Sequence, residues 1–177
     1  NGGRQTLNGQ VLTVKKEALT DLAPELEIEN LEALEKIFLK PGPFIQSDHQ
    51  KIRDLVRDIL KNDPGADPLT RAEKLLNWVN THIEKRPVLS LPDALSTLEN
   101  KVGDCNEHAV LLAALGRAAG IPTRIEAGLV YIKDRFYYHA WNLMYLGQWV
   151  TVDPVFNQLP ADVSHLRFTT GSPERQL

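Results

Sequence analysis

Cys105 is the chain's single cysteine, and it lies where a helix is expected to begin. Asp104 precedes it, and Glu107 follows Asp104 by three residues, which is the spacing of a capping box with Asp104 as N-cap. Cys105 would then face unpaired backbone amides and the positive end of the helix dipole, which favour a thiolate. The negative charges of Asp104 and Glu107 oppose that effect. The pattern predicts a nucleophilic cysteine that needs a base; the ordinary alternative is a small buried side chain.

Five histidines could supply the base, and His139 is the candidate because it lies in the aromatic, strand-like segment 136–141. Asp153 is its candidate partner, since it ends the apolar run 149–152 and precedes Pro154, where a strand must stop. A carboxylate there could accept the imidazole N–H, fix its tautomer and stabilise the imidazolium. Taken singly, each residue has an ordinary alternative: a core histidine bonded to backbone, and an aspartate that only ends a strand.

Strand register decides whether the histidine and the aspartate can meet. If residues 146–148 form a three-residue hairpin loop whose central glycine is left-handed, Tyr145 pairs with Trp149. His139 and Asp153 then lie diagonally on one face of the sheet, within reach at a Cα spacing of about 7–8 Å. A two-residue loop would place them on opposite faces. The hypothesis of a Cys-His-Asp triad therefore depends on an odd-numbered loop or a bulge.

Two amphipathic helices are expected before the cysteine. Ser47 and Gln50 have the spacing of a capping box, which predicts a helix over about 48–61. Asp67 is followed by proline, which is typical of an N-cap before the first helical position. The apolar stripe of this second helix should stop before Pro87. Both helices are expected to cover a core with one face.

The segment that starts at Cys105 differs from these helices. Residues 105–119 are apolar on nearly every face after the first turn, which predicts a central helix surrounded by protein and ended by a left-handed Gly120. Residues 123–132, 136–146 and 149–153 are rich in β-branched and aromatic side chains, as in an antiparallel meander. Helices that precede a sheet indicate the α+β class, with the central helix packed on the sheet.

Length and composition limit the number of domains and the kinds of partner and metal site that the chain can have. A chain of 177 residues with 42% hydrophobic content suits one domain, residues 46–177, after an N-terminal extension or arm at 1–45. The net charge of -3, from 20 basic and 23 acidic residues spread along the chain, predicts no contact with nucleic acid or a membrane. One cysteine excludes an internal disulfide and a zinc site of several thiolates. The acidic stretch 24–38 could be a helix or an extended arm, and the tail from about 156 is too irregular to assign.

Four motifs in order and spacing resemble the core of the transglutaminase-like superfamily, in its bacterial-type form. They are G-D-C-N-E-H-A at 103–109, A-G-I-P-T-R at 119–124, Y-H-A-W at 138–141 and W-V-T-V-D-P at 149–154. The resemblance covers about 68–160 and implies a papain-like core. It also implies that Cys105 is the nucleophile, His139 the base and Asp153 the orienting acid. The calcium sites of the animal enzymes have no counterpart here, so no metal or other cofactor is expected.

The function that follows is cysteine-dependent acyl transfer on an amide or peptide carbonyl through a Cys105 thioester. A protein or peptide is the expected acyl donor. An amine acceptor would make the protein a transamidase, and water would make it a peptidase or amidase. Trp141 and Tyr138 are candidate substrate-binding residues, with sheet packing as their alternative role.

Two other hypotheses belong to different classes. The first is a non-catalytic binding or scaffolding module that keeps the fold within a larger protein. The second is a metal site of Cys105, His108 and His139, which would leave Asp153 without a ligand role. The natural substrate, the oligomeric state and the compartment stay open, because a signal or anchor could precede this segment in a longer exported protein.

Overall fold

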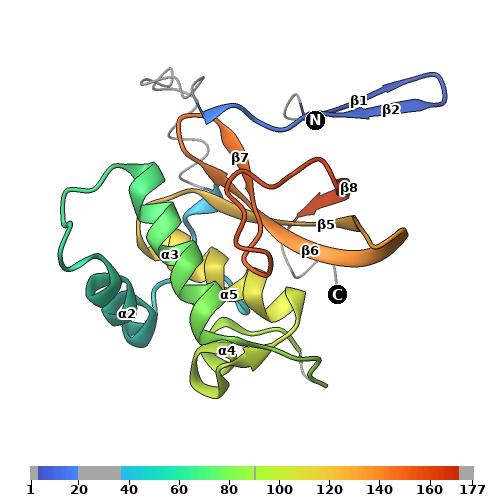
Figure 1. Ribbon diagram of the computed structural model, residues 1–177. Coiled ribbons are helices and arrows are strands. Elements are labelled where there is room, and N and C mark those ends of the chain that lie inside the picture. The colour runs from blue at the N-terminus through green and yellow to red at the C-terminus, as the bar shows by residue number, and fades with distance from the viewer. Residues whose placement is uncertain (1–3, 20–36, 90, 172–177) are drawn as a thin grey trace.

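Helices and a four-stranded antiparallel sheet form two layers (Figure 1). The computed structural model describes residues 4–19, 37–89 and 91–171. Its helices are α2 (Gln50–Leu60), α3 (Pro68–His82), α4 (Ala94–Asn100) and α5 (Cys105–Ala118). Its strands are β1 (Gln5–Asn8), β2 (Val11–Val14), β3 (Glu84–Lys85), β4 (Val102–Gly103), β5 (Thr123–Ile132), β6 (Arg135–Tyr145), β7 (Trp149–Val152) and β8 (His165–Gly171). The arrangement is α+β, as the order of the sequence patterns predicts.

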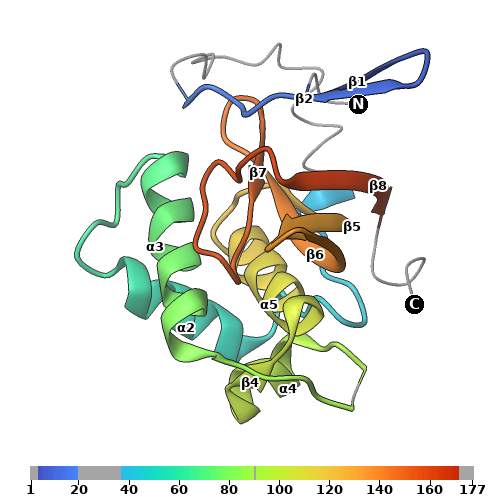
Figure 2. The same ribbon diagram turned by 45° about the vertical axis from the view of Figure 1, so that its right-hand side comes forward.

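The helix α5 is the centre of the core, as expected from its apolar sequence. It contacts β5 and β6 on one side, while α2, α3 and α4 pack around its other faces (Figure 2). Gly116 allows the close approach of helix and sheet, because a Cβ there would lie 2.5 Å from Thr123 Oγ1 and 2.7 Å from the Met144 methyl carbon. The left-handed Gly120, with φ of 75°, follows the helix as predicted.

The two covering helices test the capping predictions. Asp67 accepts the N–H groups of Leu69 and Thr70, so the predicted start of α3 is confirmed, and the helix ends at His82. The cap predicted for α2 is wrong. His49, whose side chain accepts the Lys51 N–H, is the N-cap, and α2 begins at the following residue. The Ser47 side chain is buried before the helix begins.

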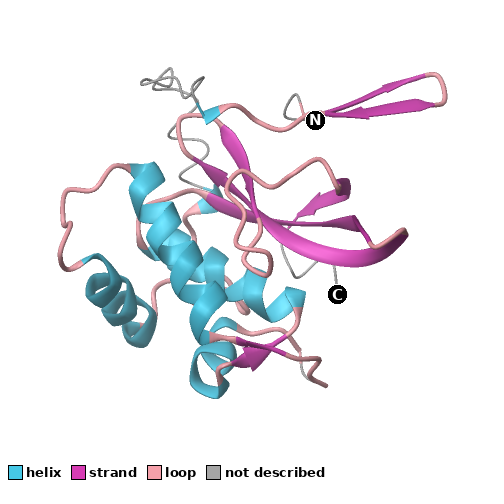
Figure 3. Cartoon of the chain, viewed as in Figure 1, coloured by secondary structure: helices cyan, strands magenta, loops and turns pink. Residues whose placement is uncertain are grey.

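The sheet has the strand order β7-β6-β5-β8 (Figure 3). β6 pairs with β5 along its whole length but with β7 only over residues 142–145. The predicted register is confirmed, because Tyr145 pairs with Trp149 and Gly147 in the loop is left-handed with φ of 95°. The short pairing with β7 leaves the rest of that edge of β6 uncovered by a strand of the described residues.

The strand β8 was not predicted from the irregular tail. It pairs with the outer edge of β5, with a register shift between Ala127 and Gly128. Gly128 is required at this bulge, because an added Cβ would lie 1.9 Å from the carbonyl oxygen of Leu166. The first residue of β8 is His165, and it is fully buried. The bulge therefore brings a histidine from the end of the chain into the sheet.

The described part of the N-terminal arm is attached to the sheet at β7. β1 and β2 form a separate hairpin that projects from the domain (Figure 1). Arg4 is buried and donates to Glu17 at 2.6 Å and to the carbonyl oxygen of Ala161 at 3.0 Å. Glu17 accepts the Thr151 hydroxyl at 2.6 Å. Most of the segment 24–38 lies outside the described residues.

None of the described helices is long and apolar enough to cross a membrane.

Candidate active site

Cys105 is the first residue of α5, at the position expected from the sequence. The capping box is formed, with the Asn106 N–H donating to Asp104 Oδ1 at 2.8 Å and the Asp104 N–H donating to Glu107 Oε2 at 2.9 Å. These two bonds use the Asp104 and Asn106 amides. The amide of Cys105 lies between them, in the first turn, where helix N–H groups have no intrahelical acceptor.

The uncovered edge of β6 faces the cysteine. Backbone groups of alternate residues point to opposite edges of a strand, and the Tyr145 N–H donates to Pro122 on the β5 side at 2.9 Å. The Ala140 N–H therefore points to the other edge, which β7 covers only from Asn142 onward. The Cys105 sulfur lies in this gap and faces the Ala140 N–H. The early end of β7 thus makes room for the helix terminus beside β6.

His139 and Asp153 meet as the register predicts. His139 Nε2–H donates to Asp153 Oδ2 at 2.7 Å, and both side chains are buried. Asp153 Oδ1 accepts the N–H groups of Val155 at 2.7 Å and Phe156 at 3.0 Å. Burial alone would raise the pKa of Asp153, but the bonds from His139 and a second histidine outweigh it and hold that pKa below its usual range. Asp153 is therefore an ionised carboxylate that fixes the proton of His139 on Nε2.

The environment of the thiol opposes ionisation. Burial raises the pKa of Cys105 to about 11, and the charges of Asp104 and Asp153 add to the rise, while the Ala140 N–H lowers it. The sequence-based expectation that the helix terminus favours the thiolate is outweighed by burial in the resting site. Among the described residues no hydrogen bond joins the thiol to His139. The cysteine therefore depends on a base to lose its proton at neutral pH.

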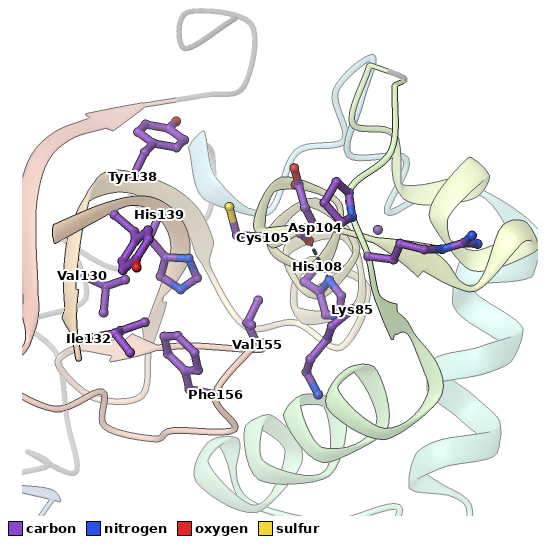
Figure 4. A pocket seen from close by; sticks show the side chains of 14 residues that line it. Lys85, Asp104, Cys105, His108, Val130, Ile132, Tyr138, His139, Val155 and Phe156 are labelled. Atoms are coloured by element: carbon purple, nitrogen blue, oxygen red, sulfur yellow. Dashed lines mark hydrogen bonds between the residues drawn. The ribbon is translucent and has the colours of Figure 1, made fainter. Parts of the chain in front are cut away.

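Cys105 and His139 line one pocket of about 260 Å³ (Figure 4). The Cys105 side chain comes from the start of α5, and the His139 ring comes from β6 on the opposite wall. The remaining lining residues are Lys85, Arg86, Pro87, Gly103, Asp104, His108, Val130, Ile132, Tyr137, Tyr138, Val155 and Phe156. Because the Nε2 atom of His139 is bonded to Asp153, Nδ1 is the ring nitrogen left for proton exchange with the thiol.

The two candidate substrate-binding residues have different positions. Tyr138 lines the pocket and is 60% exposed, so its predicted contact with a substrate remains open. Its pKa is raised by partial burial and by the nearby charges of Cys105 and Asp104. Trp141 is 1% exposed and donates from Nε1 to Glu126 at 3.1 Å. Trp141 does not line the pocket, and its ring packs beside His139 and against His165, so direct contact with a substrate in this pocket is not expected of it.

His165 is the polar group of this site that the sequence analysis missed. Its Nε2–H donates to Asp153 Oδ2 at 2.8 Å, so two imidazoles share one carboxylate oxygen. His165 was not identified because the strand β8 was not predicted. The pairing of β8 with β5 depends on residues about 40 positions away and on the bulge at Gly128. A strand assignment for 165–171 would have identified His165 as a candidate.

The same group of side chains has the residue types of a metal site. Among the His, Cys, Asp and Glu side chains of the described residues, only His139, Asp153 and His165 form a group of three whose ligand atoms lie within 4.8 Å of one another. Zinc ligands at about 2.0–2.1 Å in tetrahedral geometry would stand about 3.3 Å apart. The observed separations of 2.7 and 2.8 Å are instead those of direct hydrogen bonds. The alternative site of Cys105, His108 and His139 is not assembled, and His108 Nδ1–H donates to the carbonyl of Asp104 at 2.6 Å.

Comparison with known families agrees with this architecture. A model of the transglutaminase-like superfamily matches residues 53–154, which is more than half of the 177-residue chain and spans α3, α5 and the strands that bear the candidate residues. The chain belongs to the transglutaminase-like superfamily. The four sequence motifs had pointed to this family, and its papain-like layout of a central helix against an antiparallel sheet is the fold observed.

Two solved structures share the transglutaminase-like fold. One, from Cytophaga hutchinsonii, was described as a candidate cysteine protease; it gives a TM-score of 0.64 at 22% identity over 88% of this chain and 50% of that one. The periplasmic domain of TgpA from Pseudomonas aeruginosa gives 0.55 at 21% identity over 71% of this chain and 48% of that one. This chain therefore spans about half the length of these structures. A search of curated proteins found no match.

Proposed function

We propose that this domain catalyses acyl transfer from an amide or peptide carbonyl through a thioester on Cys105. The observation that carries the proposal is the His139–Asp153 hydrogen bond at the wall of the pocket that also contains the Cys105 sulfur. A carboxylate that fixes the Nε2–H tautomer leaves Nδ1 to take a proton from a nucleophile. Membership of the transglutaminase-like superfamily supports this assignment of roles.

In the proposed reaction the Cys105 sulfur attacks the carbonyl carbon while its proton passes to His139 Nδ1. The C–N bond then breaks, His139 returns the proton to the departing amine, and the acyl group stays on sulfur as a thioester. A primary amine or water next attacks the thioester and gives a proton to His139. The acyl group leaves with the new nucleophile, and the proton returns to the sulfur.

The negative charge that develops on the carbonyl oxygen needs hydrogen-bond donors. The Cys105 amide, in the first turn of α5, belongs to the same residue as the reacting sulfur and has no intrahelical acceptor, so it is the proposed donor. The positive end of the helix dipole favours an oxyanion at the same point. The helix terminus thus contributes to the transition state, whereas burial keeps the resting thiol protonated.

The substrate class is a protein or peptide. The pocket wall near His139 is formed by Val130, Ile132 and Phe156, which suits an apolar group beside the reacting carbonyl. Tyr138, half-exposed at the same wall, is the proposed contact for the substrate main chain or side chain. Whether water or an amine resolves the thioester depends on how the bound substrate excludes water from the pocket.

The test compares wild type with Cys105→Ser in two assays on peptide and protein substrates. One assay follows hydrolysis of amide bonds, and the other follows incorporation of a labelled primary amine into a glutamine-containing protein. We expect activity in at least one assay, reduced in Cys105→Ser by about 10³-fold or more, because a serine hydroxyl is a far weaker nucleophile. A Cys105→Ser variant with wild-type turnover would contradict the proposal.

A further inference from the structure

The Asp153 carboxylate has more partners than a histidine and its backbone anchors. Oδ1 accepts two backbone N–H groups, and Oδ2 accepts the Nε2–H of His139 at 2.7 Å and of His165 at 2.8 Å. The side chains of Asp153 and His165 are both fully buried. Water cannot replace a donor that is lost at such a site without entering the core. Each of the four bonds therefore helps to fix the carboxylate.

The array of hydrogen bonds continues outward from His165. Its Nδ1 lies 3.3 Å from Asp162 Oδ1 and 3.3 Å from the Ser164 hydroxyl oxygen. The Ser164 hydroxyl itself donates to Asp162, whose side chain is 46% exposed. Acid and imidazole groups thus alternate from the surface at Asp162, through His165 and Asp153, to His139 beside the pocket.

The orientation of the His165 ring is fixed by packing as well as by hydrogen bonds. The Trp141 ring meets it edge-on at a centroid distance of 5.1 Å, and the Phe156 ring meets it in the same manner at 6.1 Å. The missing Cβ of Gly128 lets the backbone of β8 approach β5 next to this ring. His165 therefore has one orientation, with Nε2 directed at the carboxylate.

We propose that His165 is a positioning residue of this active site: its Nε2–H holds Asp153 Oδ2 in place, so that His139 keeps its Nε2–H tautomer and presents Nδ1 to Cys105. The inference rests on the proposed acyl transfer for its effect on turnover. Its effect on the tautomer of His139 does not depend on any reaction. His165 acts through Asp153 and does not contact the pocket.

Three substitutions separate the hydrogen bond from the packing of the ring. In His165→Gln the amide nitrogen takes the place of Nε2 and can still donate to Asp153. In His165→Asn the amide nitrogen takes the place of Nδ1, on the side of Asp162, and cannot reach Asp153. His165→Leu has the same number and branching of side-chain heavy atoms as asparagine and no donor. Thermal unfolding of each variant identifies any that does not fold.

The first readout is steady-state kinetics. We expect His165→Gln to keep kcat within about threefold of wild type, whereas His165→Asn and His165→Leu lose about tenfold or more in kcat with KM little changed. If His165 acted through packing alone, kcat would fall in all three variants in proportion to their loss of stability. Equal kcat values in the glutamine and asparagine variants, both folded, would overturn the proposal.

The second readout is the ring nitrogen spectrum of His139 by NMR, in a Cys105→Ala background and at a pH at which the spectrum itself shows a neutral ring. We expect one tautomer, protonated at Nε2, in the parent and in His165→Gln, and a mixture in His165→Asn. An unchanged single tautomer in His165→Asn would refute the inference. If the wild type lacked turnover but the tautomers behaved as expected, the proposed function alone would fail, and the positioning role of His165 would stand.

Discussion

The two walls of the pocket shift the pKa values of their acidic side chains in opposite directions. On the α5 side, the Cys105 thiol is buried next to Asp104, and its pKa is raised to about 11. On the sheet side, Asp153 is more deeply buried than Cys105, yet four hydrogen bonds hold its pKa below the usual range. Both side chains lose contact with water, but only Asp153 has four hydrogen-bond donors that stabilise its charged form. In the proposed reaction, activation of Cys105 is therefore expected to come from the sheet wall, through His139.

The largest expected effect comes from changing the hydrogen bonds of the sheet wall without changing its shape. In Asp153→Asn the amide oxygen is expected to stay at the Oδ1 position, because that position accepts the Val155 and Phe156 N–H groups. The NH₂ group then faces the two Nε2–H groups and forces His139 into the other tautomer. We expect kcat to fall by about 10³–10⁴-fold, measured by steady-state kinetics.

The control for this prediction is thermal unfolding of the same variant. The asparagine removes one buried charge but replaces an oxygen that accepts two hydrogen bonds with a donor group, so a lower Tm is expected. An Asp153→Asn protein that keeps kcat within tenfold of wild type would show that the tautomer of His139 does not govern the reaction. The contrast between the two walls would then have no catalytic meaning.

A smaller effect is expected from moving the strand that completes the sheet wall. In Gly128→Ala the new Cβ would overlap the Leu166 carbonyl oxygen, which lies 1.9 Å from its ideal position. The backbone of β8 must shift, at a cost of about 1–3 kcal/mol in the free energy of unfolding. Urea unfolding measures that cost. Gly65→Ala is the matched control, because a Cβ there meets no atom within 4 Å.

The same shift should displace His165, because this residue is a neighbour of Leu166 in β8. We therefore expect kcat of Gly128→Ala to fall by several-fold in addition to the loss of stability. A Gly128→Ala protein as stable as wild type would mean that β8 is not held at this distance from β5. The sheet wall would then be less rigid than the hydrogen bonds of Asp153 imply.

The smallest effect concerns the helix wall and its pH dependence. Burial raises the pKa of Glu107 from 4.5 to about 7 in the folded protein. Between these values the unfolded chain ionises while folded Glu107 keeps its proton, so stability falls as pH rises from about 4.5 to 7 and then stays lower. Glu107→Gln can keep the capping bond to the Asp104 N–H and has no charge to bury.

Urea unfolding at about pH 5 and pH 8 measures this difference. We expect the stability of Glu107→Gln relative to wild type to be greater at the higher pH, since only the wild type must then bury a carboxylate. Titrating groups that do not interact with Glu107 act equally on both proteins and cancel in the comparison. A relative stability that is the same at both pH values would show that Glu107 is not held in its protonated form.

Sequence patterns predicted the parts of this site that depend on local signals. The capping box at Asp104, the buried helix after Cys105 and the left-handed Gly147 are encoded within a few residues of each feature. Gly147 also set the register, because an odd-numbered loop puts His139 and Asp153 on one face. These local features were sufficient to predict a hydrogen bond between residues 14 positions apart.

Other features depend on distant contacts, and the sequence could not show them. His165 enters the site through the pairing of β8 with β5 and through a bulge at Gly128. The raised pKa of Cys105 results from burial by surrounding elements, and it outweighs the helix-terminal effect that the local pattern suggested. Trp141 was expected at the pocket, yet its ring packs beside His139 and against His165, and the Glu126 carboxylate from β5 accepts its N–H. In each case the decisive partner lies on another element.

The most direct test of the account is the rate of Cys105 alkylation by iodoacetamide near neutral pH in wild type and in His139→Ala. His82→Ala is the matched control, since that histidine is exposed on α3 and stacks on Trp78 away from the pocket. Burial raises the pKa of Cys105 to about 11, so the resting thiol needs a base to react near neutral pH. We expect His139→Ala to slow alkylation by about 100-fold or more while His82→Ala leaves it unchanged. Equal rates in wild type and His139→Ala would contradict the account, because the sheet wall would then not activate the cysteine.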